Sequence, residues 1–148
     1  MMKSIVIATD GSGSAKEAVD VGLELAKEQG ADVVFVHVLP PDDIHAGRAA
    51  HAVHPHAVEM DESETALKEA AAAADEAGIT YELERVSGDT VPLIVAIADA
   101  KDADLIVVGS RGRGTIASTL LGSVSHGVMT HAKRPVLIVR GAEVPAKT

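Results

Sequence analysis

The sequence predicts an α/β protein, an open and doubly wound sheet of parallel strands with helices on both faces. Short aliphatic runs recur along the 148 residues, as is typical of strands buried on both faces of a sheet. Segments with helical spacing of apolar residues separate these runs, and that alternation favours parallel strands. The expected strands are residues 4–8, 32–38, 80–86, 105–108 and 136–139, and the expected helices are residues 15–29, 57–77, 91–100 and 123–132.

The first half of the chain contains clear signals for where its elements begin and end. Ser14 and Glu17 have the spacing of a capping box, which predicts that the first helix begins there. Gly30 is suited to the left-handed residue that ends such a helix. Pro40 and Pro41 stop the second strand, since proline cannot continue a central strand. A strand, a helix and a second strand therefore follow one another within about forty residues.

The second half continues the same alternation. Residues 42–56 contain proline, glycine and four histidines and are expected to form a long loop. The alanine-rich segment 57–77 favours a helix by propensity. Charged residues alternate with others along residues 80–86, and this pattern predicts a weaker strand at an edge of the sheet. Asp89 is a suitable cap for the helix 91–100 that follows.

Composition excludes several classes of protein. The length fits one domain, residues 1–148, and 47% hydrophobic residues exclude intrinsic disorder. The absence of cysteine excludes disulfides and thiolate metal sites. A net charge of −9 disfavours binding to nucleic acid. No apolar run is long enough for a membrane span or a signal peptide, so we expect a soluble, cytoplasmic protein.

The positions just after three strands are expected to lie together. In open parallel sheets, ligands bind beyond the carboxyl ends of the strands, where the winding of the chain reverses. Asp10, Val38 and Gly109 each lie at or just past such an end. They are expected to line one crevice if their strands are neighbours.

The glycine-rich stretch from Val107 to Ser125 is the strongest candidate for a binding element. It is not a P-loop, because the chain contains no G-x-x-x-x-G-K-[ST] sequence. Residues 112–117 match G-x-G-x-x-A, but the acidic residue that a dinucleotide site needs about 20 positions later is missing. The next acidic residue is Glu143, close to the end of the sequence. The dinucleotide interpretation is therefore rejected.

A wider glycine spacing fits a phosphate site better. Gly109 and Gly112 allow the backbone to turn away from the strand, and Gly122 and Ser123 would begin the last helix, whose free amides attract anions. Arg111 and Arg113 would add positive charge, and Ser125 a hydroxyl. The alternative is a structural turn followed by a capped helix, with both arginines as surface charges.

The stretch resembles the G-2x-G-9x-G-[ST] nucleotide motif of the universal stress protein family. The opening IVIATDGSGSA, the strand end VFVHVL and the closing HAKRPVLIVR also resemble that family. The resemblance covers essentially the whole chain, and residues 42–56 fit it least. It implies a five-stranded parallel sheet in the order 3-2-1-4-5 and membership of the subgroup that binds ATP. It also implies a homodimer formed through the edge strand Val136–Val139, which would remove an exposed aliphatic edge.

The resemblance further assigns residues to the parts of ATP, accompanied by Mg²⁺ or Mn²⁺ held mainly by the phosphates. Ala8, Thr9 and Asp10 would border the nucleoside, with the Asp10 carboxylate accepting hydrogen bonds from the ribose, and Val38 would pack near adenine. The residues expected to approach the ribose and the phosphates are Val108, Gly109, Arg111, Gly112, Gly122, Ser123, Val124 and Ser125.

No catalytic constellation is found, because the hydroxyls near the phosphates have no identifiable base beside them. His45, His51, His54 and His56 lie in the predicted loop without the regular spacing of a zinc site, so no metal site is predicted. His37 is expected only to pack at a strand end. The function predicted is an ATP-binding stress-response or regulatory module; a slow ATPase or autophosphorylating protein and a nucleotide-free interaction dimer are the alternatives.

Overall fold

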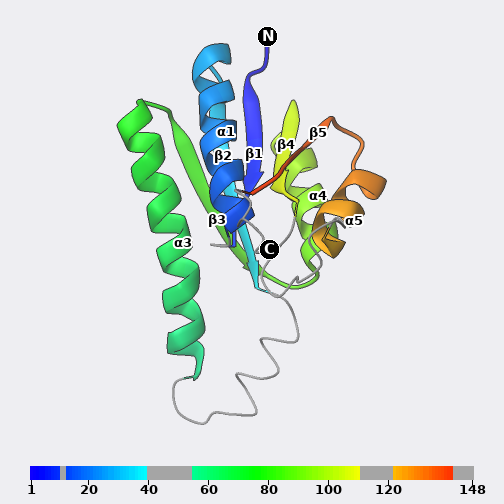
Figure 1. The fold of residues 1–148 in the computed structure, drawn as a ribbon. Helices are drawn as coiled ribbons and strands as arrows, with labels where there is room; N and C mark the ends of the chain where they lie inside the picture. Colours follow the sequence, from blue (N-terminus) through cyan, green and yellow to red (C-terminus); the bar gives the residue numbers. More distant parts are fainter. Residues whose placement is uncertain (11–12, 40–54, 111–121, 142–148) are drawn as a thin grey trace, which may run out of the picture.

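The computed structural model describes residues 1–10, 13–39, 55–110 and 122–141. These residues form one parallel sheet of five strands in the order β3-β2-β1-β4-β5 (Figure 1). The predicted fold class, strand order included, is thereby confirmed. The strands are β1 (Ser4–Ala8), β2 (Asp32–Leu39), β3 (Tyr81–Ser87), β4 (Leu105–Gly109) and β5 (Val136–Val139).

Helices cover both faces of the sheet. They are α1 (Gly13–Gln29), α3 (Pro55–Ala77), α4 (Thr90–Ala100) and α5 (Ser123–His131). In Figure 1, α1 and α3 lie over one face, and α4 and α5 lie over the other. Within the described ranges, no helix combines the length and the apolar character needed to cross a membrane.

Two apolar clusters hold these layers together. Successive side chains of a strand point to opposite faces, so Ile5 and Ile7 of β1 pack under α1 and α3, whereas Val6 packs under α4 and α5. We call the first cluster the α1–α3 side and the second the α4–α5 side. Phe35 is the largest side chain that is fully buried, and it belongs to the α1–α3 side. The remaining core is almost entirely aliphatic, as the composition requires.

The predicted ends of the elements are confirmed in part. Gly30 has a φ of +69°, the left-handed conformation expected of the residue that ends α1. The capping-box prediction is wrong, because α1 begins at Gly13 and Ser14 lies inside its first turn. Asp89 occupies the N-cap position of α4, but its side chain makes no cap hydrogen bond. The sequence pattern therefore located the helix starts without giving their hydrogen bonds.

The two edge strands differ in character. β3 pairs only with β2 and carries the charged residues Glu82, Glu84 and Arg85, which discourage pairing with another chain. β5 pairs only with β4 and consists of four partly buried aliphatic residues. Both strands had been predicted to lie at edges, and both predictions are confirmed.

Candidate functional site

The carboxyl ends of β1, β2 and β4 meet at one edge of the sheet. β1 pairs with β2 on one side and with β4 on the other. The chain winds from β1 outward to β2 and β3, and later from β4 outward to β5. The winding therefore reverses between β1 and β4, the position where open α/β sheets bind ligands. The structure brings the ends of the three predicted strands to this crevice.

Four of the predicted site residues lie on the same side of the sheet. Val108 is buried in the apolar cluster of the α4–α5 side, and Ala8, Val38 and Val124 pack against the same cluster. They come from β1, β2, β4 and the first turn of α5. Of these side chains, Val108 is buried, whereas Ala8, Val38 and Val124 are only partly buried at the ends of their elements.

Thr9 and Asp10 follow directly after β1. Thr9 is buried, its N–H donates to the Val36 carbonyl at 2.9 Å, and its carbonyl oxygen lies 2.9 Å from Nδ1 of His37. Asp10 is partly buried. The expectation that His37 packs at a strand end is confirmed, but its hydrogen bond to Thr9 was not foreseen.

Gly109 permits a very close approach between β4 and α1. A Cβ at this position would lie 2.6 Å from Oγ of Ser14 and 2.7 Å from its carbonyl carbon. Gly141, beyond β5, meets the same residue, since a Cβ there would lie 2.9 Å from the Ser14 Cα. Any larger residue at either position would displace the first turn of α1, which begins three residues after Asp10. Both glycines are therefore required for space.

The Ser110 carbonyl joins the end of β4 to the start of α5. It accepts the Gly122 N–H at 2.7 Å and the Ser125 hydroxyl at 3.0 Å. The Ser125 hydroxyl also lies 3.1 Å from the Gly122 carbonyl, and the side chain is only 1% exposed. In addition, the Ser110 N–H donates to Val139 of β5 at 2.8 Å. These hydrogen bonds fix the first residues of α5 beside the crevice.

The first turn of α5 begins beside the end of β4. Gly122 is the N-cap, with φ −68° and ψ 162°, and Ser123 is exposed at the first helical position. Unpaired amides and the positive end of the helix dipole favour an anion at such a terminus. The Ser125 hydrogen is directed at protein carbonyls, so Ser125 supports the turn in this structure. Arg111 and Gly112, with Arg113, lie outside the described residues.

The described residues contain no group of three or more histidine and carboxylate side chains close enough to hold a metal. His45, His51 and His54 lie outside the described ranges, and His56 lies in α3 at a position whose side chain is not described. The prediction of no metal site therefore remains a prediction for this segment.

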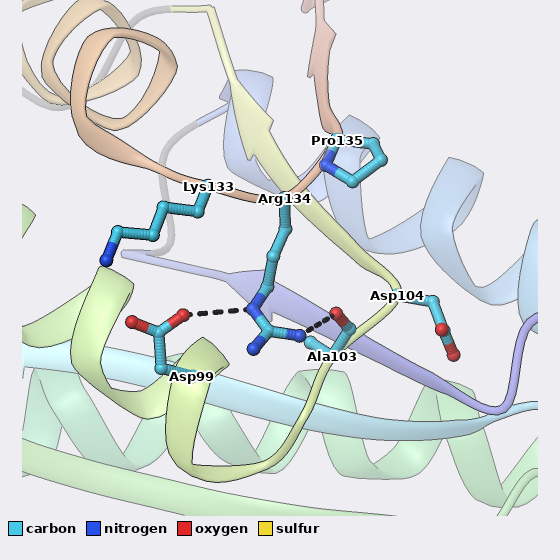
Figure 2. Close-up of a pocket in the computed structure, with 6 residues that line it drawn as sticks. All are labelled: Asp99, Ala103, Asp104, Lys133, Arg134 and Pro135. Carbon is cyan, nitrogen blue, oxygen red and sulfur yellow. Dashed lines mark hydrogen bonds and ion pairs between the residues drawn. The ribbon is translucent and has the colours of Figure 1, made fainter.

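A surface pocket of about 530 Å³ lies at the opposite end of the sheet, between the C-terminal part of α4 and the segments that enter β4 and β5 (Figure 2). Arg134 donates to Asp99 at 2.9 Å and to the Ala103 carbonyl at 2.6 Å, and it lies 3.3 Å from Asp102. The hydrogen bond from Arg134 to Asp99 raises the pKa of the guanidinium further. The sequence pattern does not predict this charged pocket, because the residues that line it come from two segments far apart in the sequence.

Asp104 lines the same pocket and anchors the start of the chain. Its carboxylate accepts the N–H groups of Lys3 at 2.7 Å and Ser4 at 3.1 Å. These backbone hydrogen bonds hold the pKa of Asp104 below its usual range, and the bond from Lys3 has the largest effect. The charged groups of this pocket are thus largely engaged with one another and with the backbone.

Comparison with known proteins agrees with the fold. A universal stress protein of Methanocaldococcus jannaschii is 35% identical over 142 residues, which cover 95% of this chain and 83% of that protein. The solved structure of the hypothetical protein MJ0577 superposes with a TM-score of 0.83 at 23% identity, covering 96% of this chain and 98% of the other. That similarity concerns the fold alone.

Two solved relatives contain nucleotides. A universal stress protein in complex with cAMP is 35% identical, with a TM-score of 0.67 and coverage of 93% of this chain and 96% of the other. A universal stress protein from Archaeoglobus fulgidus in complex with dAMP is 26% identical, with a TM-score of 0.68 and coverage of 94% and 98%. The model of the universal stress protein family matches residues 1–140. The chain therefore belongs to the universal stress protein family.

Proposed function

We propose that this protein binds ATP in the crevice between β1 and β4 and that the nucleotide acts as a structural or signalling ligand. The observation that carries the proposal is the connection made by Ser110, which holds the N-terminus of α5 against the end of β4 where the winding reverses. An anion-binding helix start and the ligand position of an open sheet thus coincide.

The described residues fit an adenine nucleotide. Ala8 and Val38, both partly buried at the ends of β1 and β2, would lie against the adenosine, with Val38 near the base, whereas Val108 and Val124 would lie nearer the ribose and phosphates. The Asp10 carboxylate, just after β1, would accept hydrogen bonds from the ribose hydroxyls. The backbone at Gly109 and the exposed Ser123 at the start of α5 would face the phosphates. Arg111 and Gly112 complete the proposed motif, and Mg²⁺ or Mn²⁺ would be held mainly by the phosphates.

The nucleotide complexes of two relatives support this assignment, with cAMP in one and dAMP in the other. Both ligands have an adenine and one phosphate. ATP differs by its longer phosphate chain, which the glycine-rich motif of this chain suits. Binding of ATP would change the loops around the crevice and thereby alter which protein partners the surface accepts.

Calorimetry with ATP and magnesium, cAMP and dAMP would test the proposal, after the sample is checked for co-purified nucleotide. We expect micromolar binding of ATP, about −8 kcal/mol, and weaker binding of the monophosphates. Gly122→Val should abolish ATP binding by filling the helix start. Met129→Ala is the control, because Met129 is an exposed residue of α5 beyond its first turn.

Other outcomes would assign another function. No binding by nucleotide-free protein would contradict the proposal and favour an interaction dimer. Turnover of ATP that Ser123→Ala abolishes, with ATP still bound, would favour a slow ATPase or an autophosphorylating protein. Preferential binding of cAMP would indicate that the ligand is a cyclic nucleotide and not ATP.

We also propose that two copies associate through β5. The Pro135 carbonyl accepts from Ile106 of β4 and the Val139 carbonyl from Ser110, the residue after β4, so alternation directs the Ile138 N–H toward the open edge. Pairing of two aliphatic edges would remove an exposed row of backbone groups. Ile138→Pro should therefore convert a dimer to a monomer in sedimentation equilibrium, whereas Ile138→Val should not. A wild-type monomer would contradict the proposal.

A further inference from the structure

His37 is a buried polar side chain at the end of β2. It is 5% exposed, and the residues that precede it on the same face, Val33 and Phe35, are apolar and buried. Its Nδ1 lies 2.9 Å from the carbonyl oxygen of Thr9. A carbonyl oxygen only accepts, so Nδ1 carries the hydrogen and donates it. An imidazole at this depth is costly unless it is hydrogen-bonded, and this bond offsets the cost.

The bond lies where the pairing of β1 with β2 ends. The last paired residues are Ala8 and Val36, and the Thr9 N–H donates to the Val36 carbonyl at 2.9 Å. The Thr9 carbonyl is held by His37, so both backbone groups of Thr9 are tied to β2. β1 therefore remains fixed for one residue beyond its last pair, immediately before the chain turns toward α1.

Fixing that carbonyl also fixes the next peptide unit. The peptide bonds of the described residues are trans, so the Asp10 N–H points opposite to the Thr9 carbonyl. The carbonyl points toward β2, and the Asp10 N–H consequently points away from β2, in the direction of β4. The orientation of the Thr9–Asp10 peptide sets the direction in which Asp10 leaves the strand.

We propose that His37 is a positioning residue of the crevice, which orients the Thr9–Asp10 peptide so that Asp10 meets the ribose of a bound adenine nucleotide. This role rests on the function proposed above. His37 acts through Thr9 and Asp10 and does not itself contact the ligand.

Two substitutions separate the hydrogen bond from the packing. In His37→Asn, the side-chain amide nitrogen occupies the position along the side chain that Nδ1 has in histidine, so the donor is retained. In His37→Phe, a ring of similar shape is retained and the donor is lost. We expect His37→Asn to bind ATP within about threefold of wild type and His37→Phe to bind at least about tenfold more weakly in calorimetry. If His37→Phe does not fold, His37→Leu takes its place.

Amide hydrogen exchange of Thr9 without nucleotide provides a second measurement. Exchange at Thr9 should accelerate in His37→Phe and stay slow in His37→Asn. Equal ATP affinity in wild type, Asn and Phe proteins would overturn the proposal, and so would an equal loss in both variants. If wild type binds no nucleotide, the assignment of His37 to ligand positioning falls with the proposed function; changed Thr9 exchange in His37→Phe alone would still establish that His37 orients the peptide.

Discussion

The two ends of the sheet are built from different interactions. At the amino end, Arg134, Asp99 and Asp104 form hydrogen bonds with one another or with nearby backbone. At the carboxyl end, glycines allow backbone segments to touch, and Ser123 is exposed in the first turn of α5. At the amino end, Arg134, Asp99 and Asp104 are engaged within the chain, whereas the proposed site at the carboxyl end uses the start of α5 for a ligand. A pocket by itself therefore does not mark the candidate site, since the described pocket lies at the amino end.

The largest effect is expected for Gly109→Ala at the carboxyl end. The added Cβ would overlap the backbone of Ser14, which cannot rotate away as a side-chain tip can. We expect a loss of about 3 kcal/mol in stability and at least about a tenfold loss of ATP affinity, because the first turn of α1 must shift. Thermal denaturation and calorimetry measure the two effects. A variant with wild-type affinity would show that the α1–β4 contact has no influence on the crevice.

The next effect is expected at the amino end, for Arg134→Met. The substitution removes the hydrogen bonds to Asp99 and to the Ala103 carbonyl but keeps most of the aliphatic stem. The melting temperature should fall by a few degrees, roughly 2–6 °C, while ATP affinity stays unchanged. Lys133→Met, in the same pocket, is the control and should leave both quantities unchanged. Reduced ATP affinity in Arg134→Met would contradict the separation of the two ends.

A smaller effect is expected for Ser125→Ala, which tests how the start of α5 is held. The Ser110 carbonyl would lose one of its two donors but keep the Gly122 N–H, so no buried group is left unpaired. The stability loss should be about 1 kcal/mol, with a moderate loss of ATP affinity. Ser123→Ala is the matched control, because Ser123 is exposed and should affect affinity without affecting stability. If Ser125→Ala instead lowered ATP affinity without lowering stability, Ser125 would contact the ligand directly.

The sequence predicted the fold more completely than the site. The aliphatic runs and the helical spacing gave the parallel sheet, because strands buried on both faces leave a clear pattern. The resemblance supplied the strand order. The hydrogen bond between His37 and Thr9 and the close approach of Gly109 to Ser14 could not be predicted, since both depend on packing between distant segments. The ligand roles of all the predicted site residues remain predictions, and Arg111 and Gly112 also lie outside the described ranges.

The smallest effect is expected for Asp104→Asn, and it depends on pH. The amides of Lys3 and Ser4 hold the folded-state pKa of Asp104 below its ordinary value, so the folded protein favours the charged carboxylate more than the unfolded chain does. The resulting stability is present above the ordinary carboxyl pKa of about 3.9 and is lost as the pH falls through the lower folded-state pKa. Wild type should therefore melt slightly above Asp104→Asn at neutral pH, and the difference should vanish in acid. A difference that stays constant from neutral to acid pH would mean that Asp104 stabilises the amino end through its shape and its hydrogen bonds, and that its charge contributes nothing.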